Sequence, residues 1–76
     1  MIEQSVTTLK AGEKGKIVGI AARDAASLRK LTVFGLLPGM ELEMIQTFPA
    51  FVLEIGNTQL ALDYEAASGI VVVKCM

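Results

Sequence analysis

Residues 31–46 read Leu31-Thr-Val-Phe-Gly35-Leu-Leu-Pro-Gly39-Met-Glu-Leu-Glu-Met44-Ile-Gln46, and the spacing of their apolar side chains changes partway along. Upstream of the change, Leu28, Leu31 and Gly35 fall at helical spacing. Downstream, Leu42 and Met44 alternate with two glutamates, which is the two-residue period of a half-buried strand. The stretch therefore predicts the end of a helix followed by the start of a strand.

Two glycines mark backbone stops between this helix and this strand. Gly35 stands where a helix commonly closes with a left-handed residue, and Pro38-Gly39 suits the two central positions of a type II turn. Leu36 and Leu37 lie between the two stops, and at least one of their side chains is poorly placed to reach a core. Because the stops hold the loop in few conformations, we expect it to present an apolar side chain at little entropic cost.

Upstream of the junction, the sequence predicts one strand and one helix. Residues 7–15 form an irregular lead-in, and residues 16–22 are short and β-branched, with Gly19 indicating a bulge. Asp24 is placed to cap a helix over residues 25–34, which consist mostly of good helix formers. This is the only segment with a convincing helical pattern.

Downstream of the junction, the sequence alternates between strand patterns and turn residues. Pro49 interrupts strand pairing, Gly56-Asn57 fits the two-residue loop of a II′ hairpin, and residues 63–69 allow a single helical turn. The strands are expected over residues 41–48, 51–55, 58–62 and 70–74. Five strands, with one short helix between the first two, predict a mainly β fold that forms a small barrel as one domain over residues 1–76.

Composition excludes several classes of protein. The chain has 76 residues, of which 53% are hydrophobic and 20% charged, so it has the composition of a folded domain and not of a disordered one. A net charge of -1 disfavours nucleic acid and anionic membranes as partners. Cys75 is the one cysteine, and the N-terminal residues resemble no signal peptide, so we expect a cytoplasmic protein without disulfides and without membrane insertion.

The residues that most enzymes use are scarce. The chain has no histidine, so the usual general base and the commonest transition-metal ligand are missing. Asp24, Asp63, Glu65 and Cys75 could supply metal ligands, but nothing in their spacing makes them a ligand set. Met44 is expected to fill the core and not to bind a soft metal. The sequence therefore predicts a protein that is not an enzyme and has no cofactor and no metal site.

Apolar residues are crowded into the middle third of the chain. A small barrel internalises about one side chain in two along each strand, so some of these residues are expected to remain exposed and to bind a protein partner. The alternative, in which all of them fill the core and its rims, has equal support from the pattern alone. The predicted docking residues are Phe34, Leu36, Leu37, Pro38, Gly39, Phe48 and Phe51.

The segment from Leu28 to Leu42 resembles the signature of the FeoA family, ferrous iron transport protein A. The resemblance extends to the lead-in and first strand over residues 9–20, to residues 56–62, and to the closing strand that begins at Ile70. It implies an SH3-like β-barrel and a small cytoplasmic accessory protein that acts on FeoB, the membrane GTPase that moves ferrous iron. In that reading the partner-docking loop is the one that contains Leu36 and Leu37.

The same barrel also resembles the C-terminal domain of DtxR-type iron-dependent repressors. That resemblance implies an alternative function, a free-standing regulatory module that responds to a transition metal. A small barrel that binds nucleic acid is a third reading, which the charge and the scarcity of aromatic residues disfavour. For the oligomeric state, we expect a monomer or a weak homo-oligomer.

Overall fold

Six strands and three short helical segments make up the protein, in a computed structural model that describes residues 2–21 and 25–75. More residues lie in strands than in helices, because the β-branched and alternating segments of the chain suit a half-buried sheet. The elements are β1 (Glu3–Ser5), the 3-10 helix η1 (Val6–Thr8), β2 (Lys14–Ile20), α1 (Ala25–Val33), β3 (Glu41–Gln46), β4 (Phe51–Ile55), β5 (Thr58–Leu62), α2 (Tyr64–Ser68) and β6 (Ile70–Cys75).

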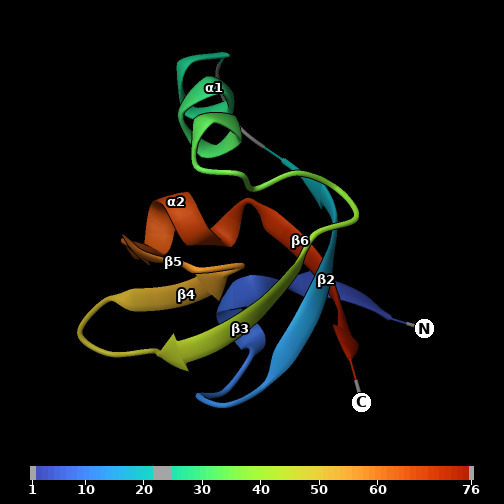
Figure 1. Ribbon diagram of the computed structural model, residues 1–76, viewed down its shortest axis with the longest axis vertical. Coiled ribbons are helices and arrows are strands. Elements are labelled where there is room, and N and C mark those ends of the chain that lie inside the picture. Colours follow the sequence, from blue (N-terminus) through green and yellow to red (C-terminus); the bar gives the residue numbers. More distant parts are fainter. Residues whose placement is uncertain (1, 22–24, 76) are drawn as a thin grey trace.

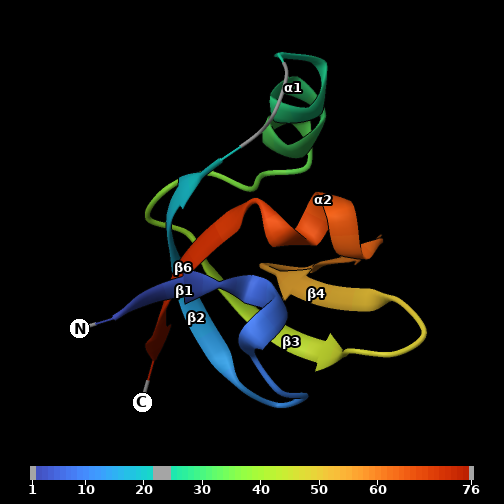
Figure 2. The ribbon, with the colours of Figure 1, turned by 180° about the vertical axis from the view of Figure 1, so that it is seen from behind.

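All six strands form one curled antiparallel sheet in the order β1-β6-β2-β3-β4-β5 (Figure 1). The two ends of this order, β1 and β5, are not paired with each other in the described part of the chain. The short helix α2 contacts both β5 and η1, and the Ser5 hydroxyl donates a hydrogen bond of 3.2 Å to the Ser68 carbonyl (Figure 2). The helix α2 therefore covers the side of the barrel that strand pairing leaves open.

The sequence prediction of five strands and one helix was incomplete. The additional strand β1 has only three residues and no apolar alternation, so its sequence carries no strand signal; it forms because Glu3 pairs with Val73 on β6. The α1 helix therefore lies between the second and third strands, not between the first two. Asp63 caps α2 by accepting from the Ala66 N–H at 2.8 Å, which makes the expected helical turn a second helix. The predicted cap at Asp24 lies outside the described residues.

The core lies inside the curled sheet and is entirely apolar among the described residues. Strands β2 to β6 contribute inward side chains, such as Leu42 and Met44 from β3, so the two-residue period seen in the sequence is realised. Met44 is fully buried, as expected for a core filler. The buried set is Val6, Leu9, Ile17, Leu31, Leu36, Leu42, Met44, Leu53, Ile55, Leu62, Ala67, Ile70 and Val72.

Two local predictions from glycine are confirmed. The register between β2 and β6 shifts between Ile17 and Gly19, which is the predicted bulge. Gly56 has φ 61° while Asn57 has no positive φ, as a II′ hairpin between β4 and β5 requires. These devices bend β2 and fix the pairing of β4 with β5.

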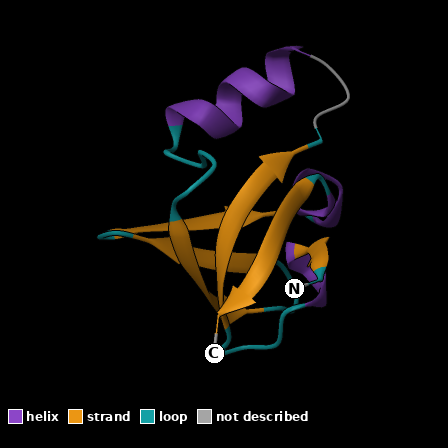
Figure 3. Cartoon of the chain, turned by 90° about the vertical axis from the view of Figure 1, so that its right-hand side faces the viewer, coloured by secondary structure: helices purple, strands orange, loops and turns teal. Residues whose placement is uncertain are grey.

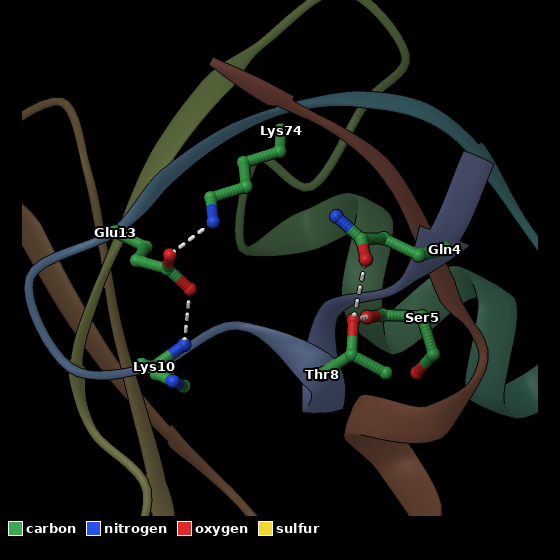
Figure 4. A network of polar contacts seen from close by, with 6 residues as sticks. All are labelled: Gln4, Ser5, Thr8, Lys10, Glu13 and Lys74. Carbon is green, nitrogen blue, oxygen red and sulfur yellow. Dashed lines mark hydrogen bonds and ion pairs between the residues drawn. The ribbon is translucent and has the colours of Figure 1, made fainter. Parts of the chain in front are cut away.

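A polar cluster links the residues just before β2 to strand β6. The Glu13 carboxylate accepts a hydrogen bond from the Lys10 backbone N–H at 2.7 Å and forms an ion pair with Lys74 (Figure 4). The N–H of Lys10, and to a smaller extent Lys74, lowers the pKa of Glu13 below its ordinary value, because both interactions favour the charged carboxylate. The lowered pKa makes the stability of the fold depend on pH at this position.

Glu13→Gln is expected to destabilise the protein slightly at pH 7 and to have no effect in strong acid. A group whose pKa is lowered on folding contributes stability above its unfolded pKa, and that contribution disappears as the pH falls through the folded pKa. Thermal unfolding of the wild type and the variant between about pH 7 and pH 2 measures the difference. A difference in melting temperature that stayed constant over this range would contradict the assignment.

Candidate docking surface

The C-terminal end of α1 closes with a Schellman motif. Gly35 has φ 88°, the Gly35 N–H donates to the Thr32 carbonyl at 3.0 Å, and the Leu36 N–H donates to the Leu31 carbonyl at 3.1 Å. A side chain other than glycine would be strained at this φ. The motif turns the chain sharply and satisfies carbonyls that the end of a helix otherwise leaves free.

The next turn is fastened to the sheet. Gly39 has φ 95°, and the Met40 N–H donates to the Leu37 carbonyl at 3.1 Å, as in a type II turn with Pro38 and Gly39 at its centre. The Gly39 N–H donates to the Ile17 carbonyl at 2.7 Å, and the Ile17 N–H donates to the Met40 carbonyl at 2.8 Å. Both predicted stops are therefore present, and the loop is held on β2 by two backbone hydrogen bonds.

Leu36 and Leu37 have opposite environments although they are adjacent. Leu36 is fully buried in the core together with Leu31, so its prediction as a docking residue was wrong. The Schellman turn accounts for the burial, because it brings the residue after the glycine back against the last turn of the helix. Leu37 is 44% exposed, and the neighbouring Pro38 and Gly39 are exposed as well. Leu37 is thus the apolar side chain that the loop presents to solvent.

Other exposed apolar side chains lie near Leu37 in the sequence. Phe34 and Met40 flank the loop, and Leu28 and Val33 belong to α1, with Val33 77% exposed. The docking residues predicted from the sequence did not include Leu28 or Val33. Val33 follows the buried Leu31 by two residues, which places it about 200° around the helix, so helical geometry could have identified it. We define the docking surface as Leu28, Val33, Phe34, Leu37, Pro38, Gly39 and Met40.

The two other predicted docking residues do not belong to this surface. Phe48 is 84% exposed, but it lies in the connection from β3 to β4, which is remote from α1 in both ribbon views (Figures 1 and 2). Phe51 in β4 is half-buried against the core, and its ring centroid lies 6.1 Å from that of Tyr64. The apolar residues crowded in the middle of the sequence therefore do not form a single exposed surface.

Both charged side chains of residues 25–40 are positive. Arg29 and Lys30 are exposed on α1, and residues 25–40 contain no aspartate or glutamate. The rest of the described chain carries seven carboxylates and four lysines. The molecule is therefore bipolar, with a cationic apolar end at α1 and an acidic remainder.

Other features offer less chemistry. No group of three or more potential metal-binding side chains occurs among residues 2–21 and 25–75. Cys75 is half-buried at the end of β6, opposite Lys14 of β2. A shallow groove of about 240 Å³, lined by Glu3, Val18, Gly19, Ile20, Ala21 and Val71, offers a single carboxylate. None of the described helices has the length and apolar character needed to cross a membrane.

The chain matches a family of known proteins and resembles several solved structures. The FeoA domain family model matches residues 4–74. A crystal structure of an iron uptake regulatory protein, FeoA, shares 21% identity with a TM-score of 0.88, covering 99% of this chain and 100% of the other. Zinc-complexed FeoA from Stenotrophomonas maltophilia, described as a prokaryotic SH3 domain protein and as a candidate ferrous iron transport activating factor, shares 22% identity with a TM-score of 0.84, covering 92% and 89%.

A manganese-dependent transcriptional repressor has the same fold over part of its length. It shares 19% identity with a TM-score of 0.91, and the match covers 99% of this chain but 42% of that chain. No curated protein matches the chain. The fold is therefore SH3-like, and it occurs both as a small separate protein and as a part of larger ones.

Proposed function

The chain belongs to the FeoA family, and on that basis we propose that it is a cytoplasmic accessory protein of ferrous iron transport that docks on a FeoB-like membrane GTPase. In this role it acts by binding and not by catalysing a reaction. The family supports the link to ferrous iron transport, and the FeoA of S. maltophilia is described as a candidate activating factor of that process.

One observation carries the docking role, namely the exposed apolar side chain of Leu37 on a loop that cannot easily rearrange. Two glycines in left-handed conformation and two hydrogen bonds to Ile17 fix this loop before any partner arrives. A preorganised apolar group loses little conformational entropy on binding, so most of its burial energy appears as affinity. Such residues are typical binding hot spots when a partner encloses them.

The proposed function predicts direct binding of the wild-type chain to the GTPase. The full-length GTPase, from the same genome and purified in detergent, is titrated with the chain while association and GTP hydrolysis are recorded. We expect saturable one-to-one binding with a Kd in the micromolar range or below, together with a changed rate of hydrolysis or of iron transport in reconstituted vesicles. Absence of binding at a chain concentration of about 100 µM would overturn the proposed function.

The likeness to a manganese-dependent transcriptional repressor supports a second candidate function. A fold that makes up less than half of that repressor can serve here as a free-standing regulatory module. Capture of a metalloregulator by the immobilised chain, under conditions in which the GTPase is not captured, would favour this alternative. Capture of the GTPase alone would exclude it.

A further inference from the structure

The position of α1 shows how a partner can reach it. The helix rises from one end of the molecule and lies apart from the strands (Figure 3). It is anchored to the core by Leu31 and, just beyond its end, by Leu36. Much of its circumference is therefore open to a partner.

Exposed apolar side chains occur on more than one side of α1. Leu31 points inward, and at about 100° per residue Leu28 lies about 60° to one side of it, while Val33 lies about 200° away, on the outer face. Both Leu28 and Val33 are exposed. Phe34, three residues after Leu31, is exposed just beyond the helix, next to the loop. A flat partner surface can cover one of these sides, whereas a groove can cover the outer face and a flank together.

The outer face also carries the two cations. Arg29 precedes Val33 by four residues and Lys30 precedes it by three, so both are neighbours of Val33 on the helix surface. A helix that lies on a membrane keeps its apolar side chains on one face and its cations on the other, which is not the arrangement here. A protein groove with apolar walls and acidic groups near its rim matches both kinds of side chain.

We propose that α1 inserts as a helix into a groove of the partner whose walls are apolar and whose rim is acidic. This inference rests on the proposed function and specifies the docking surface of the partner. The acidic remainder of the chain repels such a rim while Arg29 and Lys30 attract it, so the encounter is oriented with α1 foremost. Helix-in-groove recognition of this type uses apolar anchors at helical spacing.

The test compares matched variants against the full-length GTPase in nanodiscs of zwitterionic lipid. Val33→Gln removes the outer apolar side chain, and Ile2→Gln is its control, because Ile2 is 82% exposed but directly precedes β1, a strand that lies apart from α1 (Figure 2). We expect Val33→Gln to weaken binding at least about five-fold and Ile2→Gln to leave it unchanged. Circular dichroism and melting temperature establish that both variants are folded.

The charge component is tested with the double variant Arg29→Glu/Lys30→Glu. It is expected to weaken binding at least about ten-fold in about 50 mM salt, and added salt should weaken wild-type binding but not binding of the variant. Lys10→Glu, a reversal on the lead-in of the barrel, is the control and should lose much less. If the affinity of the wild type did not depend on salt, the proposal that the partner's groove has an acidic rim would be overturned.

The remaining outcomes separate the two proposals. If Leu37→Asp weakens binding but Val33→Gln does not, the partner contacts the loop alone and the groove is overturned, while the proposed function stands. If the wild type binds vesicles of anionic lipid without GTPase as tightly as it binds the GTPase, the cations recognise lipid and the inference is overturned. If the wild type binds no GTPase under any condition, the proposed function itself fails.

Discussion

Leu37→Asp is expected to weaken binding to the membrane GTPase by about 30-fold or more without unfolding the protein. A preorganised hot spot is worth at least about 2 kcal/mol, which corresponds to that factor in Kd, and a buried unpaired carboxylate adds to the loss. Since Leu37 is exposed in the free protein, its replacement should change the free energy of unfolding by no more than about 0.5 kcal/mol. For a domain of this size, that is a shift in melting temperature of at most about 4 °C.

The two measurements are isothermal titration with the GTPase and thermal unfolding followed by circular dichroism. Phe48→Asp is the matched control, because Phe48 is also exposed and apolar but lies outside the docking surface. If Leu37→Asp collapses the fold, Leu37 is a core residue. If it folds and binds normally, docking occurs elsewhere, and Phe48→Asp in the same titration would show whether the β3–β4 connection is the site.

Leu36→Ala is expected to have the opposite effect, a large loss of stability. Leu36 is fully buried, and removing a buried leucine side chain costs about 2–5 kcal/mol. At roughly 0.05–0.15 kcal/mol per residue, the whole domain is stable by only about 4–11 kcal/mol, so a substantial fraction is lost. Urea denaturation should show a lower midpoint with an unchanged slope.

Leu37→Ala is the control for this second prediction, and it should unfold at nearly the wild-type urea concentration. Leu31→Asp, which places a carboxylate in the same buried cluster, is expected to leave no folded protein. A Leu36→Ala variant as stable as Leu37→Ala would mean that the turn after Gly35 does not hold Leu36 in the core in solution.

Leu36 and Leu37 show what could and could not be predicted from the sequence. Gly35 and Pro38-Gly39 predicted both turns, because the left-handed φ of glycine and the fixed φ of proline are properties of single residues. Which leucine faces inward depends on the direction in which the Schellman turn sends the chain, and that is a three-dimensional property of four peptide groups. The pattern could therefore predict that one leucine is exposed, but not which one.

Strand β1 and Phe51 show the same division at longer range. Glu3–Ser5 has no pattern of its own and becomes a strand only because β6 offers a hydrogen-bonding edge. Phe51 was predicted as a docking residue, whereas its side chain packs partly against the core and lies beside Tyr64, from a segment distant in sequence. The local sequence predicted the main helix, the turns and most strands. The formation of β1 and the packing of Phe51 depended instead on residues distant in sequence.

The pairing of Glu3 with Val73 brings both ends of the described chain to adjacent strands on one edge of the sheet, far from α1 (Figures 1 and 2). A segment attached at either end would leave the molecule on the side away from the docking surface. The barrel can thus be joined to another protein from either terminus while α1 stays accessible. The same arrangement makes the fold suitable both as a separate protein and as a module of a larger one.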